Sequence, residues 1–414
     1  MNVTKESRVV PVELTVRPDR GGFIVEDART GDYYEMPEPA VEALRRMREG
    51  GTLGEIGAEL AGRYPDEEID MVGFAGQLFE LGLVAQVDGT AIGNGRPDGE
   101  SEASAAIEGG VAGRNRRERG GFLWIPQSFA RLWVHPAVRA IAAAAVCANI
   151  ALIAAKPELL PRYRDAFPFE SMALNGVTWL VVSLALVLLH ELGHIMALRA
   201  YGLPAKLGIG HRTIFVVLET EMDGIWRLEP KQRHVAYLAG MGADQLVLLL
   251  ALAVQAAYPG EGGWALKLAA FAAMDLFVKT LFQCCLFMKT DLYYVLENGT
   301  GCYNLMERSR RWLAVTLGGG SDGGRGADKE PRAVRLYAVL LVAGYAFQLG
   351  LLAFYFAPQL IASAAAVVPH LADWDGGAAF WDAVVFVLEF ALAAGLLVYS
   401  WRKQRGGGAA SRSG

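Results

Sequence analysis

Long hydrophobic runs fill the chain from about residue 122 onward and alternate there with short polar segments. Several of these runs exceed the ~18 consecutive apolar residues that indicate a membrane-spanning helix. We predict about six spans, at Ala137–Ala155, Met172–Arg199, Val235–Tyr258, Trp264–Met288, Leu336–Ala357 and Ala378–Trp401. The fold class is therefore predicted to be mainly α, with residues 122–405 forming a polytopic membrane helix bundle.

A different pattern, typical of a small soluble fold, occupies residues 9–87. The segment GGFIVEDARTGDYYEM predicts two strands joined by a turn at residues 29–32. Thr52 follows a Gly-Gly break and is a candidate N-cap for a helix. Apolar residues recur at helical spacing in three sets, which are Val41, Leu44 and Met47, then Ile56 and Leu60, and then Met71, Phe74, Leu78 and Leu81. We expect a small α+β domain of winged-helix form.

Residues 88–121 separate these two parts and resemble neither. They are rich in Gly, Ser, Ala and charged residues, and they contain no apolar pattern that could form a core. Such a composition predicts a disordered linker.

The composition supports a membrane protein. Hydrophobic residues make up 53% of the chain and charged residues 20%, with a mean hydropathy of +0.26, whereas soluble proteins are usually more polar. The formal net charge of −5 and the lack of a strongly basic face argue against a nucleic-acid partner. The four cysteines have the spacing of neither a zinc ribbon nor a disulfide framework. The first residues have no apolar core, so we expect no signal peptide.

Basic residues gather before the first predicted span, in the loops after the second and fourth spans, and in the tail. Because basic loops stay in the cytoplasm, we expect both termini to be cytoplasmic. The second span then runs inward, and its last turns lie near the cytoplasmic face.

Those last turns carry the segment His190-Glu191-Leu192-Gly193-His194, which has the HExxH pattern of zinc proteases. Two histidines four residues apart share one face of a helix, so both can bind one metal ion. Glu191 could then act as a general base on a water molecule. Ionisable groups inside a membrane helix are costly and usually mark function. The alternative is a buried helix whose histidines bond to neighbouring backbone.

A catalytic zinc ion usually has three protein ligands, and we expect Asp291 to be the third. It follows the fourth predicted span, so it lies at the same depth as the histidines. Alternatively, Asp291 is solvated or caps a helix. Weaker candidates are Glu219, Glu221 and Asp223, in a stretch that predicts a hairpin over residues 209–221. The edge of such a hairpin could hold an extended substrate.

Four ionisable residues lie deep within predicted spans, away from the span ends. Asp275 and Lys279 are four apart on one helix, and we expect them to form a structural ion pair. Asp244 and Glu389 are isolated acids. The alternative for all four is the lining of a water or substrate path.

With these residues in view, the membrane part resembles the site-2-protease type of intramembrane zinc metalloproteases. The matching segments are LLHELGHIMALRAYG, HVAYLAGMGADQLVLLLAL and KTDLYYVLENGTGCYNL. The resemblance implies that His190, His194 and Asp291 bind zinc, that Glu191 is the general base, and that the protein lies in a bacterial cytoplasmic membrane. The sequence departs from the family at Leu292, Gln283 and Leu286, where many members have Gly, Asn and Pro. These departures concern how substrate is held.

Residues 9–87 resemble PqqD-like peptide-recognition domains, which bind leader peptides along a strand edge. The matching segments are GGFIVEDARTGDYYEM, VEALRRMREGGTLGEIGAEL and IDMVGFAGQLFELGLV. The resemblance implies a peptide partner for this domain. The alternative is a regulatory or assembly domain that binds no peptide.

The sequence thus predicts a zinc-dependent membrane endopeptidase that hydrolyses a peptide or membrane-protein substrate near the cytoplasmic membrane face, as in the maturation of a leader-bearing peptide. One alternative is a non-proteolytic membrane partner that binds, matures or exports peptides and retains a vestigial metal site. A metal-sensing or transport role would rest on the intramembrane acids alone.

Overall fold

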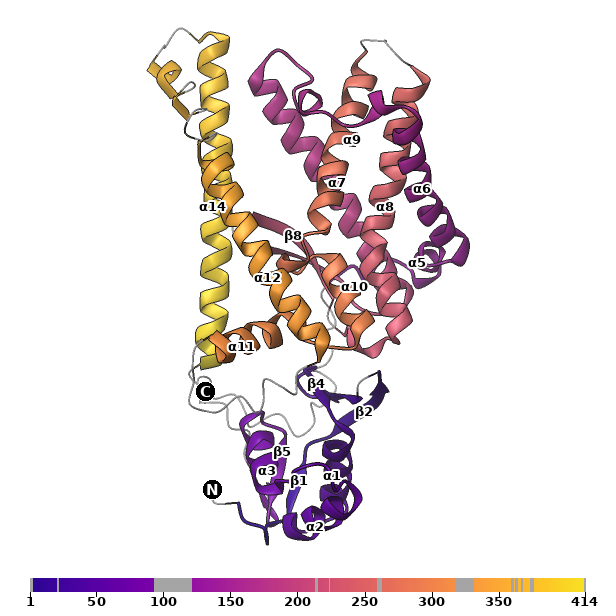
Figure 1. Ribbon diagram of the computed structural model, residues 1–414, viewed down its shortest axis with the longest axis vertical. Helices are drawn as coiled ribbons and strands as arrows, with labels where there is room; N and C mark the ends of the chain where they lie inside the picture. Colours follow the sequence, from indigo (N-terminus) through magenta and orange to yellow (C-terminus); the bar gives the residue numbers. More distant parts are fainter. Residues whose placement is uncertain are drawn as a thin grey trace. The chain divides into compact units, whose positions relative to one another are not determined.

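The computed structural model describes residues 3–20, 22–92, 121–212, 215–222, 224–258, 263–317, 331–358, 361, 364–365, 368–372 and 376–412. The chain divides into two compact units, one built mainly from the N-terminal residues and one from residues 119–409 (Figure 1).

Within its described residues, the N-terminal unit contains strands and three helices. Its elements are β1 (Val9–Pro11), β2 (Leu14–Asp19), β3 (Gly22–Asp27), β4 (Tyr33–Met36), α1 (Glu38–Arg48), α2 (Leu53–Arg63), α3 (Met71–Glu80), β5 (Val84–Val87) and β6 (Thr90–Ala91). Two antiparallel three-stranded sheets have the orders β2-β3-β4 and β1-β5-β6. The predicted α+β character is confirmed, and winged-helix form stays a prediction.

The local predictions for this unit hold. Thr52 caps α2 and forms a capping box with Glu55, which satisfies two backbone donors at the helix start. The predicted turn joins β3 to β4. The core contains fully buried side chains from all three helices and their connections, including Met47, Leu53, Leu60, Leu78 and Leu83.

The ordered part of this unit extends past the predicted boundary at residue 87. Asp88 and Gly89 both have positive φ, at 51° and 78°, and they turn the chain so that β6 pairs with β5. An Asp-Gly pair is typical of a tight hairpin turn, so the signal was present in the sequence. The rest of the predicted linker, residues 93–120, lies outside the described residues.

The second unit is mainly helical. Its helices are α5 (Gln127–Trp133), α6 (Pro136–Ala155), α7 (Met172–Ala200), α8 (Pro230–Ala257), α9 (Trp264–Gln283), α10 (Asp291–Thr300), α11 (Leu305–Leu317), α12 (Arg332–Leu351) and α14 (Ala378–Arg412). Short helical turns lie at Pro157–Leu159, Tyr163–Ala166, Ile225–Arg227, Leu286–Met288, Leu352–Phe356 and Val368–Ala372. The predicted hairpin is present as β7 (Lys206–Arg212) and β8 (Phe215–Glu221).

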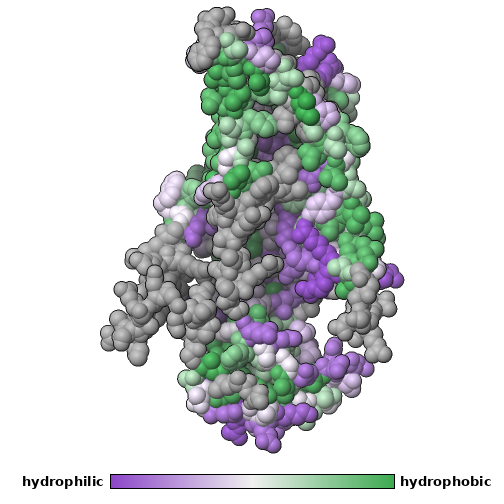
Figure 2. All heavy atoms as spheres, turned by 90° about the vertical axis from the view of Figure 1, so that its left-hand side faces the viewer, coloured by the Kyte–Doolittle hydropathy of each residue, from purple (hydrophilic) through white to green (hydrophobic). Residues whose placement is uncertain are grey.

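Among the described residues of this unit, five helices are long and apolar enough to cross a membrane, at Gln127–Ala155, Leu174–Ala200, Pro230–Ala257, Arg332–Phe354 and Ala379–Tyr399. Large apolar side chains are exposed on them, including Val339, Phe354 and Leu388 at 67%, 87% and 62%. Apolar patches of this kind are visible on the surface shown in Figure 2. The protein is therefore a membrane protein.

The fourth predicted span, Trp264–Met288, corresponds to α9, which carries Lys267, Asp275 and Lys279 and is not among these five. Asp275 and Lys279 form the predicted ion pair. The hydroxyl of Ser183 on α7 donates a hydrogen bond to Asp275, and Lys279 donates one to that hydroxyl. The pair therefore ties α9 to α7, and the count of six spans stays a prediction.

Helix α8 is the centre of the arrangement, because it packs against α6, α7, α9 and α10 (Figure 1). Its contact with α7 depends on glycine. A Cβ atom at Gly193 would lie 2.6 Å from the carbonyl oxygen of Ala239, a distance too short for any side chain. This close approach brings the last turns of α7 against the second and third turns of α8.

Candidate metal centre

Three of the predicted site residues meet at the end of α7. The Nε2 atoms of His190 and His194 lie 3.1 Å apart. The Oδ2 atom of Asp291 lies 2.9 Å from the first and 3.3 Å from the second. His194 and Asp291 are buried, and the His190 side chain is 12% exposed. Within the part of the chain that the structure describes, this is the only group of three such residues close enough to hold a metal ion.

The turn between α9 and α10 places Asp291. Lys289 has a left-handed backbone (φ 55°), which reverses the chain after the short helix at Leu286–Met288. Gln283, the last residue of α9, then holds the acid from two sides. Its amide nitrogen donates to Oδ2 of Asp291 at 2.9 Å, and its Oε1 accepts from the Asp291 backbone N–H at 3.0 Å. The Thr290 hydroxyl also donates to the Gln283 carbonyl. The end of α9 and the start of α10 are therefore joined by three hydrogen bonds.

The other ring nitrogen of each histidine is also engaged. Nδ1 of His190 lies 2.7 Å from Oδ2 of Asp244, and Nδ1 of His194 lies 2.8 Å from the carbonyl oxygen of Ala236. Since both partners are acceptors, we assign the proton of each neutral ring to Nδ1. The lone pair of each Nε2 then faces the centre, which is the arrangement that metal-binding histidines adopt.

Asp244 is a site residue that the sequence left unassigned. It is 5% exposed and lies on α8, one turn after Gly240. Its presence within an apolar span was the available signal. That it faces His190 depends on how α7 crosses α8, which periodicity alone does not determine.

The space beside the two histidines is kept open by a missing side chain. A Cβ atom at Gly240 would lie 2.5 Å from Nε2 of His194 and 2.6 Å from Nε2 of His190. Any larger residue at this position would fill the volume toward which both nitrogens point. The absence of a side chain there leaves room beside the ligand atoms.

Glu191 follows His190 directly in the sequence. It is buried, with 7% exposure. The Thr220 hydroxyl of β8 donates to its Oε2 at 2.7 Å. This contact connects the carboxylate to the hairpin, which packs beside α7. Thr220 was not singled out by the sequence, although its neighbours Glu219 and Glu221 were.

The other candidates fall elsewhere. Glu219 and Glu221 lie on β8 and are not part of the histidine cluster, and Asp223 lies outside the described residues. Glu389 lies on α14. Its carboxylate approaches Gly176 of α7 so closely that a Cβ atom at that glycine would touch it.

The electrostatics of Asp291 favour its charged form. Burial alone would raise the pKa of this carboxyl, but when the histidine rings are protonated the charge of His194 and the hydrogen bonds from both histidines hold it well below its usual range. A carboxylate is the form that binds a metal ion. Asp291 is therefore ready to act as a ligand at neutral pH.

Comparison with known proteins adds no assignment. No protein-family model, no curated protein and no solved structure matches the chain.

Proposed function

We propose that the protein is a zinc-dependent membrane endopeptidase. The observation that carries the proposal is the convergence of His190, His194 and Asp291 on one point, with the buried Glu191 on the same helix. Two imidazoles and one carboxylate form a ligand set that zinc accepts, with one position left for water or substrate. The open volume beside Gly240 fits such a site.

Zinc bound there would act as a Lewis acid, polarising the carbonyl of the peptide bond and making water more acidic. The remaining steps belong to the side chains. Glu191 would take the proton of the attacking water and transfer it to the leaving amine. Thr220 would hold one carboxylate oxygen of Glu191 by its hydrogen bond, which leaves the second oxygen for the proton. Asp244 would fix the ring of His190 and support its role as a ligand.

The β7–β8 hairpin would hold the substrate. Within the described residues, its two strands pair only with each other. An unpaired strand edge can add an extended peptide through main-chain hydrogen bonds, and extended backbone exposes the bond to be cut. Because Thr220 lies on β8, the same element would position both the substrate and the general base.

Residues 9–87 would capture the leader part of the substrate, as the resemblance to PqqD-like domains implies. A linked binding domain raises the local concentration of its ligand at a second site. The likeness of the membrane part to site-2 proteases implies a bacterial cytoplasmic membrane. The basic loops imply that both termini are in the cytoplasm. Cleavage would then occur near the cytoplasmic face.

The test compares the wild-type protein with Glu191→Gln, both full length and in liposomes. The probe is a peptide library derived from a bacterial proteome, and the products are identified by mass spectrometry. We expect the wild type to cut a defined subset of peptides and Glu191→Gln to retain zinc without cutting. Cleavage that survives in Glu191→Gln would remove this residue from the mechanism.

A second candidate is a membrane peptide-binding or export partner without proteolysis. The observation in its favour is the set of departures around Asp291, at Gln283, Leu286 and Leu292. Gln283 is fully engaged with Asp291, so its amide is not free to hold substrate. Zinc-loaded wild-type protein that binds peptides of the library without cutting any would favour this candidate.

A further inference from the structure

A groove of about 780 Å³ lies between α6 and α8, with α9 at one side. The helices come close at Ala142 and Gly242, where a Cβ atom on the glycine would lie 3.5 Å from the alanine Cβ. Around this point the lining is apolar and includes Val146, Ile150, Leu238 and Leu246. On α8, Gly240 and Asp244 contact His190 instead, so the helix separates the groove from the metal centre.

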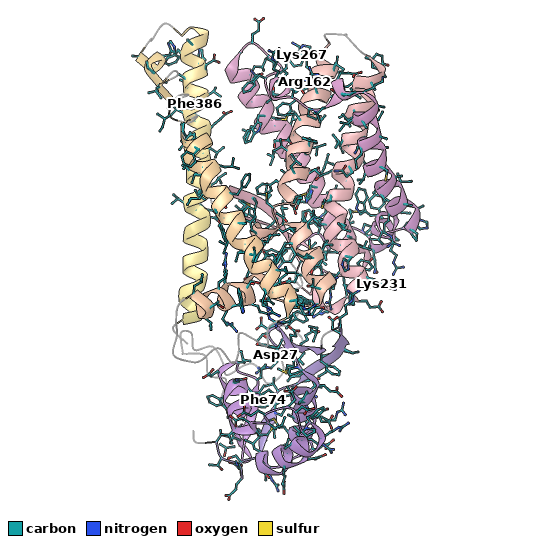
Figure 3. All side chains as sticks on the ribbon, viewed as in Figure 1. Asp27, Phe74, Arg162, Lys231, Lys267 and Phe386 are labelled. Atoms are coloured by element: carbon teal, nitrogen blue, oxygen red, sulfur yellow. The ribbon has the colours of Figure 1, made fainter. Side chains whose placement is uncertain are left out.

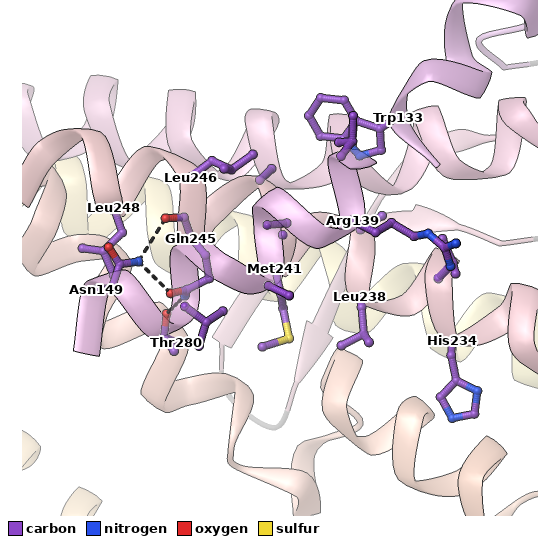
Figure 4. Close-up of a pocket in the computed structure, with 18 of the residues that line it drawn as sticks. Trp133, Arg139, Asn149, His234, Leu238, Met241, Gln245, Leu246, Leu248 and Thr280 are labelled. Atoms are coloured by element: carbon purple, nitrogen blue, oxygen red, sulfur yellow. Dashed lines mark hydrogen bonds between the residues drawn. The ribbon is translucent and has the colours of Figure 1, made fainter. Parts of the chain in front are cut away.

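The two ends of the groove differ in chemistry (Figure 4). Arg139, Lys231 and His234 lie at one end. At the other end, the Asn149 amide donates to Gln245, and the Gln245 amide donates to the Thr280 hydroxyl. This polar network connects α6, α8 and α9. The groove therefore has a basic end, called its mouth below, and an apolar interior.

The cations at the mouth have no acidic partner. Arg139 and Lys231 are exposed and belong to the first turns of α6 and α8. Within the described ranges of the chain, neither forms an ion pair. The acid closest to Lys231 in sequence, Glu229, is engaged in the capping box of α8. The backbone N–H groups of both helix starts add positive potential. Figure 3 shows Lys231 at the end of this unit opposite Arg162 and Lys267, which is where a lipid headgroup would lie.

We propose that this groove binds one anionic phospholipid. The phosphate would lie at Arg139 and Lys231, because anionic headgroups attract basic residues at the membrane surface. An acyl chain would run along Val146, Ile150 and Leu238. Both helices are among those that can cross a membrane, and Ile150 is 65% exposed, so the groove opens on the surface that faces lipid.

The chemistry of the groove favours an anionic lipid over an apolar peptide helix. Its basic end matches the charge of an anionic headgroup. Its apolar lining matches an acyl chain.

The test is native mass spectrometry of the full-length protein released from nanodiscs with equal amounts of phosphatidylglycerol and phosphatidylcholine. We expect the wild type to retain one phosphatidylglycerol, at least about tenfold in preference to phosphatidylcholine. The double variant Arg139→Gln/Lys231→Gln should lose this preference. Ala143→Trp, which adds an indole to the groove from an exposed lining position, should retain neither lipid.

The matched control is Arg335→Gln, since Arg335 is an exposed cation in the first turn of α12 and does not line the groove. It should retain lipid as the wild type does. Equal retention of both lipids by the wild type would overturn the proposal, as would an equal loss in Arg335→Gln and in the double variant. Val146→Trp repeats the steric test from another exposed position if Ala143→Trp does not fold. Phosphatidylglycerol retained by a folded tryptophan variant would place the lipid elsewhere.

Discussion

Nδ1 of His190 lies 2.7 Å from Oδ2 of Asp244, and this contact joins α7 to α8 beside the candidate metal centre. Neither residue is near the other in sequence, and both lie within membrane-type helices. A buried acid in such a helix needs a partner, and here the partner is the outer nitrogen of a metal-ligand candidate. The contact makes Asp244 a positioning residue for His190.

Asp244→Asn should therefore weaken zinc binding. The amide can still accept the hydrogen bond from Nδ1, but it lacks the charge that makes the imidazole a stronger ligand. Changes of this kind usually lower metal affinity about 10- to 100-fold. Zinc affinity measured by competition with a chelator checks this. The matched control is Glu389→Gln, the same acid-to-amide change in another span, and equal losses in both variants would contradict a specific role for Asp244.

Gly240→Ala should remove zinc binding altogether. The added methyl group would lie about 2.5 Å from both Nε2 atoms, in the volume that the ion would occupy. Gly242→Ala is the control, because its Cβ would meet only Ala142 at an ordinary distance and the helix gains the same backbone stability. Zinc analysis by mass spectrometry measures both. Full zinc content in Gly240→Ala would show that the ion is not held between these histidines.

Thr220→Val should slow the chemical step and leave zinc in place. It removes the donor to Oε2 of Glu191, and a buried carboxylate that loses such a bond is destabilised by about 1–3 kcal/mol. We expect kcat to fall about tenfold with the zinc content unchanged, and Thr220→Ser to recover most of the rate because it keeps the hydroxyl. If the serine variant is as slow as the valine variant, the hydrogen bond is not what orients Glu191.

Asp27 should make the N-terminal unit sensitive to acid. Burial alone would raise the pKa of Asp27, but the hydrogen bonds and charge of Arg29 lower it below the ordinary 3.8. Because the folded pKa is the lower one, the contact stabilises the unit above about pH 4. This stabilisation is lost as the pH falls through the lowered pKa. Amide exchange of β3 in the full-length protein, corrected for intrinsic rates, should show protection falling below pH 4 in the wild type. In Asp27→Asn, protection should be lower at neutral pH and change less with acid.

Much of the fold followed from local sequence signals. The apolar runs predicted α6, α7, α8, α12 and α14 because membrane helices have a simple length rule. The capping box at Thr52 and the β3–β4 turn depend on residues only a few positions apart. The pair of Asp275 with Lys279 follows from helical spacing alone.

The site was only partly predictable. The ligand candidates His190 and His194 share a helix face, and topology placed Asp291 at their depth. The contacts of Asp244, Thr220 and Gln283 depend on helix crossings and a turn with a left-handed residue, which one sequence does not specify. Gln283 was interpreted as a departure from a family pattern, whereas in the structure it holds Asp291. The residues that support the ligand candidates are therefore identified from how the helices pack in the structure.

The most direct test of the central claim is the zinc content of the full-length protein purified in detergent, beside His190→Ala and Asp291→Ala. The account predicts about one zinc ion per wild-type chain and almost none in either folded variant. Glu191→Gln should keep its zinc, because that carboxylate is assigned to proton transfer. A folded wild-type protein that binds no zinc, or an Asp291→Ala variant that retains it fully, would contradict the account.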